Sequence, residues 1–122
     1  MEFLDKTHEE RFLYMEKESG KTKKNKEYEI LYFIIAGNDG LWDKRSHILS
    51  ESFDELIVDL ENDKNRCVTG PFDNSERKLL NLAVNMFNIR LAKMALAEIM
   101  YDLDPRDQKL AFNLIKFKYN MN

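Results

Sequence analysis

The run Lys26–Trp42, KEYEILYFIIAGNDGLW, constrains the fold more than any other stretch of this sequence. Its apolar residues recur at the spacing of one helix face and also cover much of the remaining circumference, which is the pattern of a buried helix. A buried strand is the alternative, because Ile and Phe also favour sheets and short apolar runs are ambiguous. The charged first turn and the glycine at position 37 favour the helix. We predict that the helix ends at Gly37 and that Gly37 adopts the left-handed conformation common at helix ends.

Capping signals predict further helices on both sides of this run. Thr7 and Glu10 have the spacing of a capping box, which predicts that a first helix starts at Thr7. The segment after Gly40 is predicted to be irregular or a short helix, and four of its residues are expected in the core: Leu41, Trp42, Ile48 and Leu49. Ser52 is a candidate cap for a helix that runs to Leu60.

The helical signal is strongest in the C-terminal half. Asp73 and Ser75 are candidate caps for a helix whose polar residues form only a narrow stripe: Lys78, Asn81, Asn85 and Asn88. Leu91–Met100 continues the helical pattern. Asp104 at a cap and Pro105 at the first helical position predict the start of the last helix. This helix is predicted to bury Leu110, Ala111, Phe112, Leu114 and Ile115.

The sequence therefore predicts one all-α domain spanning residues 1–122, a compact bundle of five to six helices. Its centre is predicted at residues 30–36 and 79–87, and one short β-element is allowed near residues 66–72, where Gly70-Pro71 marks a turn. A chain of 122 residues buries roughly two-thirds of the surface that its unfolded form exposes, which is enough for one core.

Charge and hydropathy narrow the range of partners. The formal net charge is −3, whereas domains that bind nucleic acid are usually basic. No basic segment followed by an apolar stretch opens the chain, so no secretory signal is predicted. The longest apolar run, Ile30–Ala36, is far shorter than the ~20 residues that cross a bilayer. We expect a cytoplasmic protein without a membrane partner.

No motif in the sequence assigns a catalytic residue, a metal ligand or a cofactor. His8, His47 and Cys67 do not have a recognised zinc spacing. His8 is interpreted as a structural histidine beside the first helix, and His47 is interpreted in the same way. An enzyme with a pocket around either histidine is the less favoured alternative. Cys67 is the single cysteine, so no intramolecular disulfide is predicted.

Two charged surfaces are candidates for binding. Carboxylates crowd residues 51–63, either as a solvated helix face or as an acidic patch that meets a basic partner. The partner-binding candidates are Asp54, Glu55, Asp59, Glu61 and Asp63. The last helix is predicted to carry a basic face that either is solvated or lies along nucleic-acid phosphates. Its residues are Arg106, Lys109, Asn113 and Lys116.

Three blocks of sequence carry a family resemblance. They are Phe-Leu-x-x-x-His-x-x-Arg-Phe at 3–12, Tyr-Phe-Ile-Ile-Ala-Gly-Asn at 32–38, and Arg-Lys-Leu-Leu-Asn-Leu-Ala-Val-Asn-Met-Phe-Asn at 77–88. In this order they resemble a small uncharacterised domain family encoded by Gram-positive bacteria and their phages. The resemblance implies a small cytosolic domain, often on mobile elements. It supplies no activity and no catalytic residues.

The leading hypothesis is a non-enzymatic interaction protein that binds and modulates a bacterial protein. In a phage context, the partner would be a host defence nuclease or another immune effector. A small DNA-binding regulator using the basic face of the last helix is the alternative. Oligomeric state is open, and a homodimer is one of the forms considered.

Overall fold

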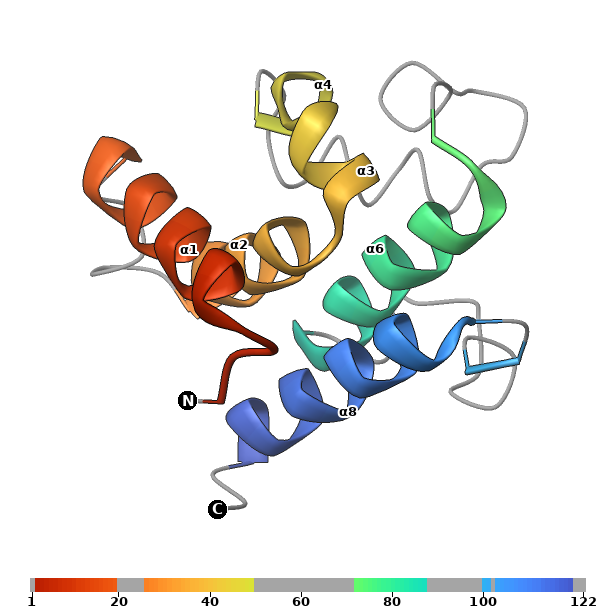
Figure 1. The fold of residues 1–122 in the computed structure, drawn as a ribbon. Helices are drawn as coiled ribbons and strands as arrows, with labels where there is room; N and C mark the ends of the chain where they lie inside the picture. The colour runs from red at the N-terminus through yellow and green to blue at the C-terminus, as the bar shows by residue number, and fades with distance from the viewer. Residues whose placement is uncertain (1, 20–25, 50–71, 88–99, 102, 120–122) are drawn as a thin grey trace.

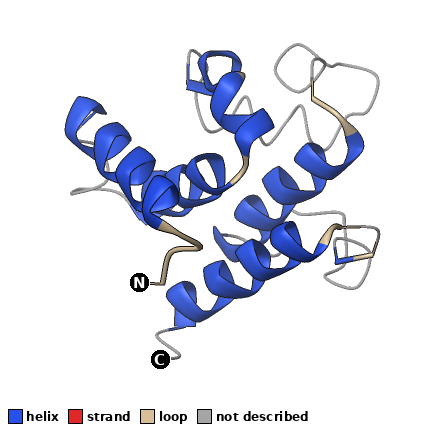
Figure 2. Cartoon of the chain, in the orientation of Figure 1, coloured by secondary structure: helices blue, strands red, loops and turns tan. Residues whose placement is uncertain are grey.

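The computed structural model describes residues 2–19, 26–49, 72–87, 100–101 and 103–119. Within these ranges it contains six helices and no strand, which confirms the all-α prediction (Figures 1 and 2). The helices are α1 (Lys6–Ser19), α2 (Lys26–Gly37), α3 (Asp39–Asp43), α4 (Arg45–Leu49), α6 (Asn74–Phe87) and α8 (Pro105–Tyr119). Among the described residues, no helix is long and apolar enough to cross a membrane.

Several predicted features lie outside the described residues. They are the helix after Ser52, the acidic segment 51–63, most of the allowed β-element at 66–72, and the helical pattern at 91–99. Phe72 is described and its side chain is buried next to the start of α6.

Helix α2 is the centre of the fold, as its apolar circumference predicts. It contacts α1, α3, α6 and α8, and every side chain from Ile30 to Ala36 is buried. Helices α6 and α8 lie side by side along it (Figure 1). Helix α6 contributes four fully buried residues to the same core: Leu79, Leu80, Leu82 and Ala83. Two residues of its polar stripe are buried as well, since Lys78 and Asn81 are each only 8% exposed, while the side chains of Asn85 and Asn88 lie outside the described part.

Gly37 ends α2 as predicted, but its backbone is not left-handed. The reason for glycine is a close approach instead. A Cβ at this position would overlap Leu110 Cδ1 of α8 and would lie 3.1 Å from His8 Cε1. Asn38 follows in an extended conformation and caps α3, because its Oδ1 accepts a hydrogen bond from Leu41 N at 2.9 Å.

The first helix begins one residue before the predicted start, at Lys6. Its cap is Asp5, whose Oδ1 accepts a hydrogen bond from His8 N at 2.9 Å. The Thr7–Glu10 capping box was therefore the wrong assignment. Aspartate caps as well as threonine does, and the register was decided by the segment before the helix, where Phe3 packs against the core.

Several assignments to the core or surface were wrong, and Ile115, which was also expected to be buried, is only partly so. Leu49 is 37% exposed and Phe112 is 54% exposed, although both were expected to be buried. Asn113 was placed on the basic face, but it is 1% exposed. It lies three residues after Leu110, so it shares the buried face of that residue. Within the described ranges, its side-chain amide has no hydrogen-bond partner.

Candidate functional site

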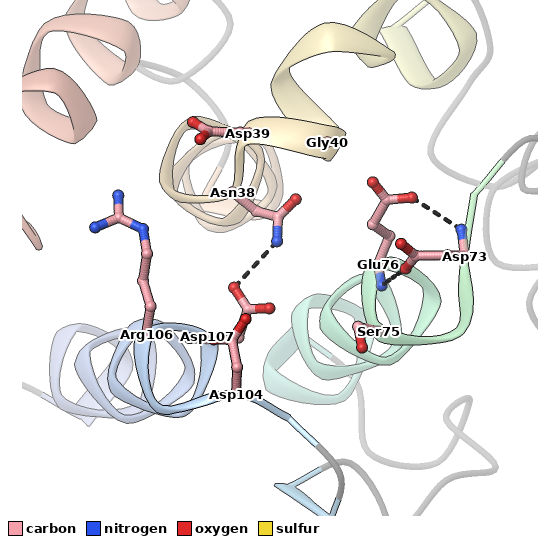
Figure 3. Close-up of a pocket in the computed structure, with 9 residues that line it drawn as sticks. All are labelled: Asn38, Asp39, Gly40, Asp73, Ser75, Glu76, Asp104, Arg106 and Asp107. Atoms are coloured by element: carbon pink, nitrogen blue, oxygen red, sulfur yellow. Dashed lines mark hydrogen bonds between the residues drawn. The ribbon is translucent and has the colours of Figure 1, made fainter.

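A polar pocket of about 350 Å³ forms where the N-terminal ends of α3, α6 and α8 converge (Figure 3). We call it the polar pocket. Its lining residues are Asn38, Asp39, Gly40, Asp73, Ser75, Glu76, Asp104, Arg106 and Asp107. Residues that precede helices are often Asp, Asn or Ser because their side chains accept hydrogen bonds from free amides of the first turn. The meeting of three helix starts therefore explains much of the polar character of this pocket.

The α6 side of the polar pocket is a complete capping box. Asp73 Oδ1 accepts from Glu76 N, and Glu76 Oε1 accepts from Asp73 N, both at 2.8 Å. Lys44 Nζ also donates to Glu76 Oε1 at 2.8 Å, and the Glu76 side chain is only 5% exposed. Gly40 lies directly against this carboxylate, since a Cβ there would overlap Glu76 Oε2. The Glu76 carboxylate is thus fixed by three groups.

The α8 side is built in the same way. Asp104 Oδ1 accepts from Asp107 N at 2.8 Å, which confirms Asp104 as the cap. Asn38 Nδ2 donates to Asp107 Oδ1 at 3.0 Å and so ties the α2–α3 corner to α8. Burial raises the pKa of Asp107, while the hydrogen bond from Asn38 acts in the opposite direction.

The remaining charges at the rim of the polar pocket are also paired. Asp39 accepts from Arg11 at 2.7 Å, and Arg106 pairs with Asp5 at 3.1 Å. In the part of the chain that the structure describes, no three His, Cys, Asp or Glu side chains are arranged to hold a metal ion. Small-molecule sites are mostly apolar cavities of about 300–1,000 Å³. A polar junction whose carboxylates cap helices and pair with cations is therefore better explained as structure than as a ligand site.

His8 fixes the N-terminal segment to α2. Its Nε2 lies 2.8 Å from the Phe33 carbonyl oxygen and donates to it, and its Nδ1 accepts from Leu4 N at 3.0 Å. The ring is fully buried between Phe3 and Phe33, and this burial lowers the pKa of His8. The structural interpretation of His8 is consistent with these contacts. His47 is exposed, and its ring lies edge-on to Phe72. Neither histidine lines the polar pocket.

The basic face of α8 is partly neutralised by the same N-terminal segment. Lys116 Nζ pairs with Glu2 at 2.7 Å and Arg106 pairs with Asp5. The hydrogen bond from Lys116 lowers the pKa of Glu2, and the hydrogen bond from His8 N lowers that of Asp5. Because Asn113 is buried, the predicted four-residue face reduces to three cations, and two of these already have carboxylate partners.

A second surface, which the sequence did not predict as a site, surrounds Trp42. We call it the Trp42 surface and define it by Arg11, Tyr14, Trp42, Arg45 and Leu49. The guanidinium carbon of Arg45 lies 3.9 Å from the centroid of the indole ring and that of Arg11 lies 5.2 Å away. The Tyr14 ring contacts the indole edge-on at a centroid distance of 6.1 Å. Trp42 packs against the core, as expected, but its side chain is only half-buried.

A groove of about 200 Å³ adjoins the Trp42 surface between α1, α2 and α4. Its lining residues are Tyr14, Met15, Glu18, Tyr32, Arg45 and Leu49. Tyr14 and Leu49 keep 52% and 37% of their surface exposed, so two large side chains with apolar surface border this groove. A signal was present in the sequence, because Tyr14 lies on the polar side of α1, whose buried residues are His8, Phe12 and Met15.

The acidic candidates Asp54, Glu55, Asp59, Glu61 and Asp63 lie outside the described residues.

Comparison with known proteins identifies no family for this chain: no family model, no curated protein and no solved structure matches it. The resemblance carried by the three sequence blocks stays a prediction.

Proposed function

We propose that this chain is a non-enzymatic interaction domain that binds and modulates another protein. The observation that carries the proposal is the Trp42 surface. Trp, Tyr and Arg are the residue types most enriched among the side chains that dominate binding energy at protein interfaces. Here Trp42, Tyr14, Arg11 and Arg45 lie together beside an apolar groove.

The size of the groove favours a protein partner over a small molecule. Its volume of about 200 Å³ is below the usual range for small-molecule sites, which is about 300–1,000 Å³. One or two side chains of a partner would fill it. The polar pocket supports an enzymatic function poorly, because its carboxylates are engaged in helix caps and ion pairs.

The family resemblance supplies a context for the partner. In a phage or mobile element of a Gram-positive host, the bound protein would be a host protein, such as a defence nuclease or another immune effector. The domain would then act in the cytoplasm. The alternative of a DNA-binding regulator draws less support, since Arg106 and Lys116 are paired with carboxylates. It predicts salt-dependent binding of duplex DNA that Lys109→Glu with Lys116→Glu abolishes.

The proposal is tested by affinity capture from Gram-positive host lysates, followed by mass spectrometry and binding assays with the purified partner. We expect a specific partner whose binding is lost in the double variant Tyr14→Ser with Leu49→Ser while circular dichroism is unchanged. The charge-reversed variant Asp54→Lys with Asp59→Lys tests the acidic segment in the same assay. The absence of any specific partner across relevant hosts would contradict the proposal.

A further inference from the structure

The Trp42 surface also indicates which kind of segment it binds, and this inference rests on the proposed function. Arg45 is held in place by two contacts: its guanidinium stacks on the Trp42 ring, and its Nη1 donates to the Trp42 carbonyl oxygen at 2.8 Å. An arginine restrained in this way loses little conformational entropy when its remaining N–H groups bind a carboxylate.

Arg45 has no carboxylate partner among the described residues. The ion pairs of that part of the chain involve Lys6, Arg11, Lys44, Arg106 and Lys116 as cations. A guanidinium stacked on an aromatic ring presents its edge to solvent, and that edge matches the geometry of a carboxylate. Among the described residues, the positive charge of Arg45 at this edge of the groove is therefore not paired with a carboxylate.

Arg11 extends the positive edge across the indole. It pairs with Asp39, whose side chain is 79% exposed. Exposed ion pairs contribute only about 0–1 kcal/mol, so a carboxylate of a partner can replace Asp39 at small cost. Two guanidinium groups thus lie over one indole ring.

The floor of the groove is apolar and complements this charge. Met15 and Tyr32 are buried at its base, while Tyr14 and Leu49 form its exposed walls. Glu18 contributes the only carboxylate among the described lining residues. A ligand with an apolar side chain in the groove would meet positive charge at the Arg45 edge.

We propose that the Trp42 surface binds a segment of a partner protein that inserts one apolar side chain into the groove and presents a carboxylate to Arg45. The residues with direct roles are Tyr14 and Leu49 as groove walls, Arg45 as the carboxylate ligand and Trp42 as the platform that orients Arg45. Charge complementarity at Arg45 favours an acidic segment over a basic one.

The test is a selection of short random peptides, displayed on yeast, against the wild-type chain and against Arg45→Gln. We expect the wild type to enrich peptides that combine an apolar residue with Asp or Glu. An enriched peptide should bind about ten- to hundredfold more weakly to Arg45→Gln, as expected for a lost charge-assisted hydrogen bond. Trp42 is the only tryptophan of the chain, so its fluorescence should change on binding.

Arg106→Gln is the matched control, because Arg106 is also a partly exposed cation but lies on α8. It should leave peptide affinity unchanged, and Leu49→Ser should weaken it. The proposal is overturned by enriched peptides without carboxylates, by no enrichment, or by equal affinity for Arg45→Gln. A dimer in light scattering that Leu49→Ser converts to a monomer would also overturn it, because a second copy would then be the occupant.

The peptide selection and the capture of a partner from lysate can fail independently of each other. If a lysate partner binds the domain and Arg45→Gln does not weaken that binding, the inference fails and the interaction function stands. If no partner is found and no peptides are enriched, both fail.

Discussion

The polar pocket and the Trp42 surface are joined by the short helix α3, and they differ in what their side chains bind. In the polar pocket, carboxylates meet backbone amides, an asparagine amide and cations of the same chain. On the Trp42 surface, aromatic and aliphatic groups remain partly exposed and Arg45 has no carboxylate partner among the described residues. The polar pocket is thus better explained by its role in stabilising the fold, whereas the Trp42 surface is the better candidate for binding a partner.

The largest expected effect is on the packing of Gly37, which directly precedes the polar-pocket residue Asn38. Gly37→Val should destabilise the fold by about 3 kcal/mol, because its side chain would overlap Leu110 in a fully buried region. Urea denaturation would measure the loss. Gly37→Ala should lie between the wild type and Gly37→Val; equal stability of all three would show that the close approach is relaxed in solution.

The two histidines provide a matched pair for the next effect. His8→Gln should cost about 2 kcal/mol, since Leu4 N and the Phe33 carbonyl lose a well-placed partner. His47→Gln should change stability little, because His47 is exposed.

The buried His8 also predicts that the stability of the fold depends on pH. Burial lowers the pKa of His8 below the ordinary value of 6.5, so near that pH the unfolded chain binds more protons than the folded chain. Stability should therefore fall as the pH decreases from about 6.5 towards the folded pKa. His8→Gln should reduce this slope, and an unchanged slope in His8→Gln would contradict a buried neutral histidine.

An intermediate effect is expected at the capping box of α6. Glu76→Ala removes the partner of Lys44 Nζ and of Asp73 N, and should cost about 1–2 kcal/mol. Ser75→Ala, at a neighbouring position that also lines the polar pocket, is the control and should cost less. Equal losses in thermal unfolding would mean that the Glu76 contacts contribute little.

Asp107 should show a smaller effect with a distinctive pH profile. Because burial raises the pKa of folded Asp107 above 3.8, the folded chain binds more protons than the unfolded chain between pH 3.8 and that raised pKa. The contribution of Asp107 to stability therefore falls as the pH rises through this range. Asp107→Asn keeps an oxygen that can accept from Asn38, so the variant should gain relative to the wild type, by less than about 1 kcal/mol, between pH 4 and 7. A relative loss over that range would indicate that the ionised carboxylate is favoured.

The smallest effect on stability is expected on the Trp42 surface. Leu49→Ser should change the free energy of unfolding by no more than about 0.5 kcal/mol, as for most surface substitutions. Leu41→Ser, at a leucine of α3 that is fully buried, should cost several times more. If Leu49→Ser lowered the free energy of unfolding as much as Leu41→Ser, Leu49 would belong to the core. The contrast between the Trp42 surface and the polar pocket would then not hold.

The sequence predicted those parts of this picture that depend on local patterns. The buried α2 helix, its end at Gly37 and the caps at Asp73 and Asp104 follow from periodicity and capping chemistry alone. The reason for Gly37 was missed, because it depends on Leu110, which is far away in the sequence. Both candidate sites were missed for the same reason.

Side-chain polarity was the least reliable guide to position. Asn113 is polar and buried, whereas Phe112 beside it is apolar and exposed. The face that a helix buries is set by the neighbours that pack on it, and one residue is a rotation of about 100° on a helix. A basic face inferred from residue type therefore included a residue that points into the protein.

The ion pairs between the N-terminal segment and α8 bear on how the chain folds during synthesis. Glu2 and Lys116 are 114 positions apart, and Asp5 and Arg106 are 101 apart, so each of these ion pairs closes a loop of more than a hundred residues. Until α8 emerges, the end of α2 at Gly37 lacks its Leu110 neighbour. Contacts between such distant residues slow folding. On the ribosome, the packing around Gly37 would thus form only after α8 has emerged, with the apolar end of α2 open to chaperones until then.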